Sequence, residues 1–598
     1  MSSPLFSNFS RLRRVMRKEI YENGLAEYKN IYVCNSPLLG FMNNHFPKYM
    51  EHRHIGNINT DHFKHWDDKE ANLINIKSSV SKNEWNELNK LIKDNDKTYD
   101  FVSIGGPSAF LSNHEYIMNN NGGNKIRSSH FFLSRHDSNY DGSAYYYHER
   151  DAFPVYINKV NRGQFCVFID LFKRFYCLLS KEKFINYCQT NEGFVKININ
   201  WLNIFKKPSI IYTILYKNFY LMIKNLYSNG KDLNNCLLHA QQTPNVVKKF
   251  VNYYKDKNLK FDDLLILNKE NIKAVYVNID ENYDCNKHFK WMNKKFGNIP
   301  FINFNKNEMI KYGFNLKYIK EIIGFPNDGC INPHFLSNLI NVFQGEYKEN
   351  WMIKNIWYND DGVICKLESK LGDNKESKYI KTRKLSLSLG PSANYKLDNK
   401  SFLNDYMFAS GSTSVVLFAI KCNGKYKENA DKFINKCSLF IDSVNQHWTP
   451  IEIKKDIKLD LDSNDKEDEL YHLAVLQMTG GGNFPSRHTS PDVVLNLLTN
   501  CEKIFGLNSF EENSIYYDII QLRGCGRGVT GNNTINFASL NKNNICITYG
   551  LGGIGMTTMF ANAMLINQIL ENNNNNHIEF KSKGILNHID YKSMVQIL

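Results

Sequence analysis

The chain has 598 residues, of which 42% are hydrophobic and 13% aromatic, and this composition excludes a disordered protein. A chain of this length has room for two or more domains. The formal net charge is +14, but the lysines are dispersed with no long basic run, so we favour a compositional bias over a nucleic-acid or anionic-membrane surface. The 13 cysteines form no C-x-x-C pair, which argues against a disulfide framework or zinc ribbon and favours an intracellular compartment.

The N-terminal part of the chain carries no motif that assigns a function. Its first 18 residues contain five Lys or Arg and no acid, a composition that suits either an organelle transit peptide or a basic first helix, so the compartment is cytoplasmic or mitochondrial. A cluster of histidines and aspartates over 52–68 lacks any closed ligand spacing, and no metal is predicted. The apolar segment 208–227 contains Lys217, which favours a core helix, with an amphipathic helix at a membrane surface as the alternative, over a membrane span.

The segment 99–112, YDFVSIGGPSAFLS, pairs a run of β-formers with a glycine turn. A dinucleotide-binding fingerprint needs G-x-G-x-x-G, with glycines for the turn, for close approach to the pyrophosphate and for helix packing. Gly105 and Gly106 are present, but Pro107 stands at the third position and Phe110 at the sixth. Proline is compatible with the first position of a helix, so a strand, turn and helix are still predicted, with weakened pyrophosphate contact.

Several segments after this turn predict further strands and helices. Segment 125–137 reads as the next strand and ends in Asp137. Asn332 and Pro333 are typical of a helix start. Segment 351–369 predicts a hairpin around Asp361-Gly362, and 381–397 predicts a strand that runs into Gly390.

The next part of the chain predicts an antiparallel sheet. Its first strand is expected over 410–422, and the charged stretch 453–470 is expected to be a solvent-facing insertion in a hairpin. The glycines at 480–482 predict a flexible turn between a strand and a helix. Segment 522–538, LRGCGRGVTGNNTINFA, contains Arg523 and Arg527.

The most informative stretch is 545–570, ICITYGLGGIGMTTMFANAMLINQIL. Alternating β-formers are followed by four glycines in six residues, and then by apolar residues at helical spacing. Backbone amides can approach a ligand closely at glycines, and a helix that begins there directs its N–H groups and positive dipole end toward an anion or an electron-rich ring edge. A tight turn between core elements is the alternative.

This stretch resembles the C-terminal flavin-contacting segment of the FAD-dependent oxidoreductases of the D-amino-acid oxidase/glycine oxidase superfamily. The order of helix entry, hairpin and strand into Gly390 is also similar to that superfamily. Segment 522–538 resembles the superfamily's arginine-containing hairpin, which implies a hairpin there that faces the substrate. The resemblance implies an α/β fold in which a Rossmann-like FAD-binding domain is interleaved with an antiparallel-sheet substrate domain. It also implies FAD-binding roles at Gly105, Gly106, Ser108, Asp137 (for the ribose, with Glu149 as the alternative), Gly390, Gly550, Gly552, Gly553, Gly555 and Met556.

The resemblance further implies a reaction. The flavin would take a hydride from a C–N or C–OH bond of a small anionic substrate, and Arg523 or Arg527 would clamp the substrate's anionic group. Two alternatives remain: a binding protein with an eroded cofactor site, favoured by Pro107 and Phe110, and a tRNA-modifying FAD oxidoreductase, favoured by the basic charge. The expected division is 1–98 as an extension, 99–155, 323–400 and 521–598 as FAD-binding parts, 156–322 as a helical or substrate region, and 401–520 as the substrate domain.

Overall fold

The computed structural model describes the chain in segments. The described residues are 73–78, 80–92, 98–120, 126–132, 197–199, 239, 242–255, 265–266, 274–279, 301–325, 330–331, 339–349, 351–369, 376–390, 393–403, 406–443, 446–458, 470–484, 500–501, 503–511, 514–530, 536–540, 544–550, 555–571 and 595–597. Over some of these, 518–530 among them, the backbone alone is described. The predicted features at 52–68, 208–227 and 332–338 lie outside them.

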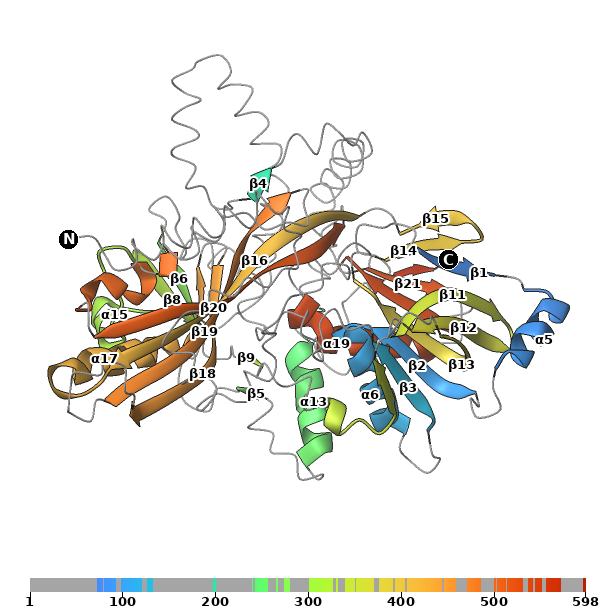
Figure 1. Ribbon diagram of the computed structural model, residues 1–598, viewed down its shortest axis with the longest axis horizontal. Coiled ribbons are helices and arrows are strands. Elements are labelled where there is room, and N and C mark those ends of the chain that lie inside the picture. The colour runs from blue at the N-terminus through green and yellow to red at the C-terminus, as the bar shows by residue number, and fades with distance from the viewer. Residues whose placement is uncertain are drawn as a thin grey trace, which may run out of the picture.

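Two large sheets make up the described molecule, and the chain passes between them several times (Figure 1). The first is a 12-stranded sheet with the order β10-β3-β2-β13-β12-β11-β1-β14-β15, in which β22 pairs with β13 and β21, and β23 with β21. Its strands are β1 (Leu73–Lys77), β2 (Tyr99–Gly105), β3 (Ser128–Phe132), β10 (Glu346–Glu349), β11 (Trp351–Asn359), β12 (Gly362–Ser369), β13 (Ser377–Ser388), β14 (Asn394–Leu397), β15 (Lys400–Phe402), β21 (Asn536–Leu540), β22 (Ile545–Tyr549) and β23 (Val595–Ile597).

The second is a 9-stranded sheet with the order β20-β16-β19-β18-β17-β6-β8-β7, and β4 pairs with β19. Its long central strands are antiparallel. Its strands are β4 (Ile197–Ile199), β6 (Ala274–Asn278), β7 (Ile302–Asn303), β8 (Glu321–Phe325), β16 (Tyr406–Lys421), β17 (Phe440–Ser443), β18 (Gln446–Lys458), β19 (Leu470–Phe484) and β20 (Ile515–Thr530). A small pair joins β5 (Leu265–Ile266) to β9 (Cys330–Ile331).

The helices cover these sheets. They are α5 (Lys82–Lys90), α6 (Pro107–Asn120), α13 (Thr243–Lys255), α15 (Lys306–Lys311), α17 (Lys427–Cys437) and α19 (Gly555–Glu571), with short 3-10 turns η5 (Gly424–Tyr426) and η6 (Leu507–Ser509). In Figure 1, α15 and α17 lie with the 9-stranded sheet at the left, while α13 and α19 lie between the two sheets. None of the described helices is long and apolar enough to span a membrane.

The strands β10, β3, β2, β13 and β22 run parallel to one another, and α6 connects β2 to β3. The predicted hairpin of β11 and β12, which turns at Asp361-Gly362, is present, and its meander continues into β13. A mixed α/β fold with one largely parallel core and a separate antiparallel sheet, joined by repeated crossings of the chain, is therefore confirmed.

Some boundaries differ from the sequence-based division. Leu73–Lys77, expected in the extension, forms β1 inside the 12-stranded sheet, because it pairs in parallel with both β11 and β14. The expected boundary at 323 falls within β8 and the one at 520 falls within β20, and both strands belong to the 9-stranded sheet. These pairings join residues far apart in sequence, so local patterns do not reveal them.

Two local predictions were wrong. Gly480, Gly481 and Gly482 continue β19 and do not form a turn, since the strand pairs there with β16, β18 and β4. Segment 522–538 is not a hairpin: β20 pairs with β16 in one sheet and β21 pairs with β22 in the other. Between 530 and 536 the chain therefore crosses from the antiparallel sheet to the parallel core.

Two apolar cores stabilise this arrangement. One fills the space between α17 and the 9-stranded sheet and includes Trp448, Phe418 and Phe433. The other lies against the 12-stranded sheet and includes Val102, Ile104 and Ile547. The expected face of α19, with Met559, Ala563, Ile566 and Leu570, is fully buried, but so are Phe560, Leu565 and Ile569, because the helix is enclosed by neighbours on nearly every side.

Candidate functional site

Three adjacent parallel strands end at glycines with left-handed backbone conformations. β13 lies between β2 on one side and β22 on the other, and all three run in the same direction. Gly105 ends β2 with φ of 107°, Gly390 follows β13 with φ of 74°, and Gly550 follows β22 with φ of 70°. Such angles favour glycine because it has no Cβ. Three of the predicted site glycines are thus gathered at the carboxyl edge of one sheet.

This edge is a topological switch point. From β2 the chain leaves through α6 to β3 on one side, while β13 pairs on the opposite side. In open α/β sheets, ligands bind in the crevice outside the carboxyl ends of strands at such points. Two helices, α6 and α19, begin just beyond β2 and β22, so their positive dipole ends flank the same edge.

Gly105 and Gly390 differ in the space around them. A Cβ on Gly105 would lie 2.3 Å from the carbonyl oxygen of Ser388, whereas a Cβ on Gly390 would meet none of the described residues within 4 Å. The backbone N–H of Gly106 donates to the same Ser388 oxygen at 2.7 Å. Gly105 therefore allows β2 and β13 to approach each other, while Gly390 leaves open space beside the edge.

The helix α6 starts at Pro107, as expected for a proline at the first helical position. Proline has no N–H to offer a ligand. Phe110, at the position of the third fingerprint glycine, is fully buried and packs edge-on against His114 and Phe343. The first turn thus keeps a helix N-terminus but has lost two features that let a pyrophosphate approach closely.

A buried hydrogen-bond network joins the starts of α6 and α19. Asn562 donates through Nδ2 to Ser108 Oγ at 3.1 Å and to Thr558 Oγ1 at 3.2 Å. The Nε2 of His239 lies 2.9 Å from Asn562 Oδ1. Burial lowers the pKa of His239 to about 4, so the ring is neutral at pH 7, and Nε2 carries the proton that it donates to Asn562. This network holds Ser108 beside the carboxyl edge.

Replacing Asn562 is expected to destabilise the fold. Asn562→Ala leaves the His239 N–H and the Ser108 hydroxyl without their partner, and an unsatisfied buried polar group is costly, so we expect a loss of about 2–4 kcal/mol in the free energy of unfolding. Asn120→Ala, at the exposed end of α6, is the matched control and should change it by less than about 0.5 kcal/mol. Chemical denaturation of the two variants measures the difference, and equal stabilities would contradict the role of the network.

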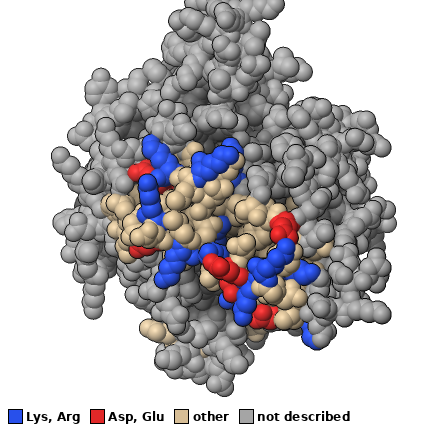
Figure 2. Space-filling view, turned by 90° about the vertical axis from the view of Figure 1, so that its left-hand side faces the viewer, with Lys and Arg blue, Asp and Glu red and all other residues tan. Residues whose placement is uncertain are grey.

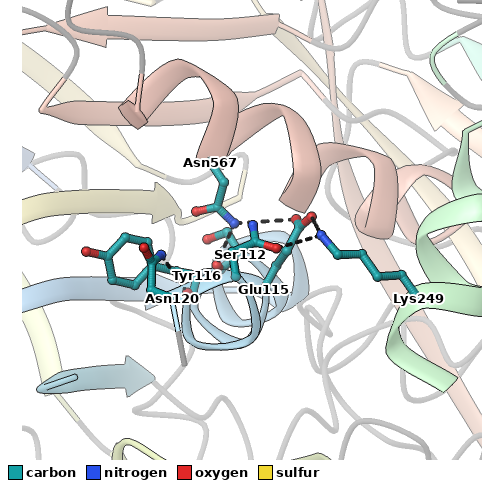
Figure 3. Close-up of polar contacts among 7 residues, drawn as sticks. Ser112, Glu115, Tyr116, Asn120, Lys249 and Asn567 are labelled. Atoms are coloured by element: carbon teal, nitrogen blue, oxygen red, sulfur yellow. Dashed lines mark hydrogen bonds and ion pairs between the residues drawn. The ribbon is translucent and has the colours of Figure 1, made fainter. Parts of the chain in front are cut away.

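A second network ties the next turns of the two helices to α13 (Figure 3). Asn567 Nδ2 donates to the carbonyl oxygen of Ser112 at 2.8 Å and reaches Glu115 Oε2 at 3.4 Å. Lys249 Nζ donates to Glu115 Oε1 at 3.1 Å. Burial raises the pKa of Glu115, although the Lys249 ammonium opposes this shift. The network is structural, since its members lie along the helix pair and not at the carboxyl edge.

The raised pKa of Glu115 predicts a pH dependence of stability. The folded state holds this proton more tightly than the unfolded state, so the contribution of Glu115 to stability falls as the pH rises from about 4.5 through the folded-state pKa. Glu115→Gln removes the ionisation, and its stability relative to wild type should rise over this window. Glu428, whose pKa the Lys432 ammonium lowers, is the control: Glu428→Gln should show the opposite trend. The lowered pKa confines the Glu428 change to pH below about 4.5, so denaturation between about pH 3 and 8 measures both, and a falling Glu115→Gln difference would refute the prediction.

The predicted arginines lie on β20 of the antiparallel sheet. The backbone register places Arg523 opposite Thr413 of β16, which lies opposite Thr479 of β19. Thr479 in turn lies opposite His447 of β18. Arg527 lies opposite Ala409, four positions further along β20. The two arginines thus belong to the sheet that the sequence analysis assigned to substrate binding. Each lies in a different row, where a row is the set of residues that lie directly opposite one another on neighbouring strands.

The same sheet carries buried polar residues that the sequence analysis missed. Gln477 and Thr449 are direct cross-strand neighbours, and they point away from the apolar core, which holds Leu476, Met478 and Trp448. Among the described residues, neither polar atom of the Gln477 amide nor the Thr449 hydroxyl has a hydrogen-bond partner. A buried unsatisfied amide costs about 1–3 kcal/mol, so this pair is a candidate ligand contact. The alternation of Gln477 with the apolar residues Leu476 and Met478 is the sequence pattern that could have indicated a polar residue on this face of the strand.

The remaining predicted site residues are only partly placed. Gly555 begins α19 and Met556 follows it, with their backbone alone described. Asp137, Gly552 and Gly553, like Glu149, lie outside the described residues.

No family model matches this chain, and no curated protein matches it. Among solved structures, a glycine oxidase from Geobacillus kaustophilus matches with 9% identity and a TM-score of 0.43 over 79% of this chain and 95% of its own. An L-proline dehydrogenase from P. horikoshii matches with 11% identity and a TM-score of 0.44 over 81% and 96%. An L-alpha-glycerophosphate oxidase from Mycoplasma pneumoniae with FAD bound matches with 11% identity and a TM-score of 0.40 over 79% and 95%. Likeness at this level does not by itself assign a function to this chain.

Proposed function

We propose that this chain is an FAD-dependent oxidoreductase that oxidises a C–N or C–OH bond of a small anionic substrate. The observation that carries the proposal is the meeting of three left-handed glycines with the N-termini of α6 and α19 at the carboxyl edge of β2, β13 and β22. Gly390, which has room beside it among the described residues, and the two helix dipoles form a site for a large anionic cofactor with flat rings.

The residues at this edge fit FAD in most respects. Gly390 has open space where a Cβ would stand, so a ligand can approach the backbone there. Ser108 Oγ accepts from Asn562 and keeps its own O–H to donate to a phosphate oxygen. Gly105 and Gly106 shape the first turn, and Asp137 would bind the ribose. The segment of Gly550, Gly552, Gly553, Gly555 and Met556 would cover the flavin ring. Pro107 and Phe110 reduce the contacts available to the pyrophosphate.

When bound, the flavin supplies the hydride acceptor. The chain's own residues bind and orient the substrate. Arg523 or Arg527 would hold a carboxylate or phosphate in a bidentate clamp. Gln477 and Thr449, which lack partners among the described residues, would donate to or accept from the polar groups of the substrate or of the flavin edge. The crossing from β20 to β21 links the sheet with these residues directly to the core with the glycine edge.

The visible absorption spectrum of the purified full-length protein tests the proposal, with the released chromophore identified. Flavin absorption bands that correspond to about one flavin per chain support the proposal. A substrate screen under anaerobic conditions then measures the bleaching of these bands. A colourless protein that also fails to bind added FAD would overturn it in favour of a binding protein with an eroded site, which Pro107 and Phe110 would explain.

The tRNA-modifying alternative makes a separate prediction. Affinity for RNA that falls steeply with salt would support it, because phosphate contacts release counterions. On the face drawn in Figure 2, Lys and Arg are interspersed with Asp, Glu and other residues, and the described residues of this face form no single-sign patch. We therefore keep the small-molecule substrate as the proposal.

A further inference from the structure

A cluster of potential metal ligands lies at the other end of the antiparallel sheet. Cys422 follows β16, nine residues beyond Thr413, the residue opposite Arg523. Nine residues of extended strand span about 30 Å, so the cluster is remote from the row of Arg523. Its other members are Asp456 of β18 and His472 of β19, and their ligand atoms all lie within 4.8 Å of one another.

The distances within the cluster are close to those of a tetrahedral metal site. Cys422 Sγ lies 3.7 Å from Asp456 Oδ1, and His472 Nδ1 lies 3.9 Å from the same oxygen. Bond lengths of about 2.0–2.3 Å from Zn²⁺ to oxygen, nitrogen and sulfur place neighbouring ligands about 3.3–3.7 Å apart in a tetrahedron. The remaining pair, Cys422 Sγ and His472 Nδ1, lies within 4.8 Å, so side-chain movements of about 1 Å or less would bring the three atoms to ligand positions.

The imidazole of His472 is held in the orientation that a ligand needs. Its Nε2 lies 3.0 Å from Asp431 Oδ1, on α17. A histidine ligand commonly donates its second ring N–H to a carboxylate, which fixes the tautomer and leaves the other nitrogen free to bind metal. His472 Nδ1 faces Asp456 and at present accepts only a 3.2 Å bond from the Asp456 backbone N–H.

The backbone at Asp456 is strained in a way that aims its side chain at the cluster. Asp456 has φ of 55°, and the pairing of β18 with β19 shifts register between Lys454 and Ile457. Strand irregularities re-aim side chains near functional sites, and left-handed non-glycine residues collect there. Cys422 and His472 are buried, whereas the Asp456 side chain is 67% exposed, so an ion can enter from solvent.

We propose that Cys422, Asp456 and His472 bind a divalent transition-metal ion of the Zn²⁺ class, with Asp431 positioning His472 and water completing the coordination. A thiolate, an imidazole and a carboxylate are the donor set that such ions prefer. Metal ions bind the thiolate form of cysteine, so metal binding would release the proton of the Cys422 thiol. The ion would join the ends of β16, β18 and β19 to α17, far from the flavin edge.

Cobalt substitution tests this site. Full-length protein is treated with a chelator and a thiol-free reductant, the chelator is removed, and Co²⁺ is added. We expect a thiolate-to-cobalt charge-transfer band that saturates at one ion per chain and is displaced by Zn²⁺. Cys422→Ser should lose this band, while Cys365→Ser, a buried thiol of β12 outside the cluster, should keep it. No saturable band, or a band that survives Cys422→Ser, would overturn the proposal.

Two further variants guard against misfolding. Asp456→Asn retains a residue type that tolerates the left-handed conformation at an exposed position, and should weaken Co²⁺ binding at least tenfold with an unchanged Tm in the presence of chelator. Asp431→Asn should weaken Co²⁺ binding about 10–100-fold while the charge-transfer band remains at saturation. Unchanged Co²⁺ affinity in Asp456→Asn would refute the site. The Co²⁺ affinity and the charge-transfer band do not depend on flavin. A failure of the metal site can therefore be distinguished from a failure of the proposed function.

Discussion

Gly105→Ala should destabilise the fold strongly, whereas Gly390→Ala should leave the fold intact and weaken the proposed binding of FAD. At Gly105 the new Cβ would lie 2.3 Å from the Ser388 oxygen and 2.8 Å from its carbonyl carbon, both backbone atoms that cannot rotate away. The φ of 107° adds strain for any L-residue. Overpacking and left-handed strain together should cost about 2–5 kcal/mol, enough to destabilise β2 and the turn into α6.

The new Cβ of Gly390→Ala meets no described residue within 4 Å, so we expect its cost to be the strain at φ of 74°, about 1–2 kcal/mol. Gly424 is a matched control, because it has φ of 55°, open space around it, and a position in η5 far from the edge. The two variants should therefore lower the Tm by similar amounts. Only Gly390→Ala should weaken FAD binding, by at least tenfold in a fluorescence titration. Equal FAD affinity in both variants would place the cofactor elsewhere.

The contrast between Gly105 and Gly390 also shows which part of the site could be predicted from the sequence and which part could not. The strand, glycine and helix order at 99–120 and at 545–571 follows from local patterns, and both units are present. What decides the role of Gly105 is Ser388, which is far away in the chain and comes close only through the parallel pairing of β2 with β13. No local pattern encodes that approach.

The failures at 480–482 and 522–538 have the same cause. Glycine-rich stretches are typical of turns, but Gly480 has strand partners on both sides, and these satisfy its backbone groups. Likewise β20 and β21 are both β-prone and close in sequence, yet each finds its partners in a different sheet. In both cases, pairing with distant strands determined the structure, and the local preference for a turn did not.

Buried polar residues were also beyond sequence patterns. Asn562 and Asn567 interrupt an apolar helix and would be assigned to an exposed face, yet both are buried and bond to α6. The ligands of the proposed metal site, at 422, 456 and 472, have no recognisable spacing because a strand bulge and a strand pairing bring them together. Sequence patterns located the elements, and pairing between distant strands of each sheet brought the residues of the candidate sites together.

Arg523→Ala is expected to lower kcat/KM for an anionic substrate about 30–1,000-fold, which corresponds to about 2–4 kcal/mol of lost charge-assisted binding. Arg523 shares a register row with Thr413, Thr479 and His447 across the antiparallel sheet, and this row lies two strand positions from that of Gln477. Arg523→Lys keeps the charge but loses the bidentate geometry, so it should recover only part of the rate. Added guanidinium ion should partly rescue Arg523→Ala.

Anaerobic bleaching of the bound flavin measures these effects without an assumed electron acceptor. Arg383→Ala is the control, since Arg383 is 74% exposed and makes one long ion pair, to Asp100 at 3.5 Å, so its bleaching rate should equal that of wild type. Arg527→Ala tests which arginine binds the anionic group. A larger loss of bleaching rate in Arg527→Ala than in Arg523→Ala would assign this contact to Arg527, in the row of Ala409. Wild-type rates in both arginine variants, or an equal loss for an uncharged substrate, would show that neither arginine binds the anionic group.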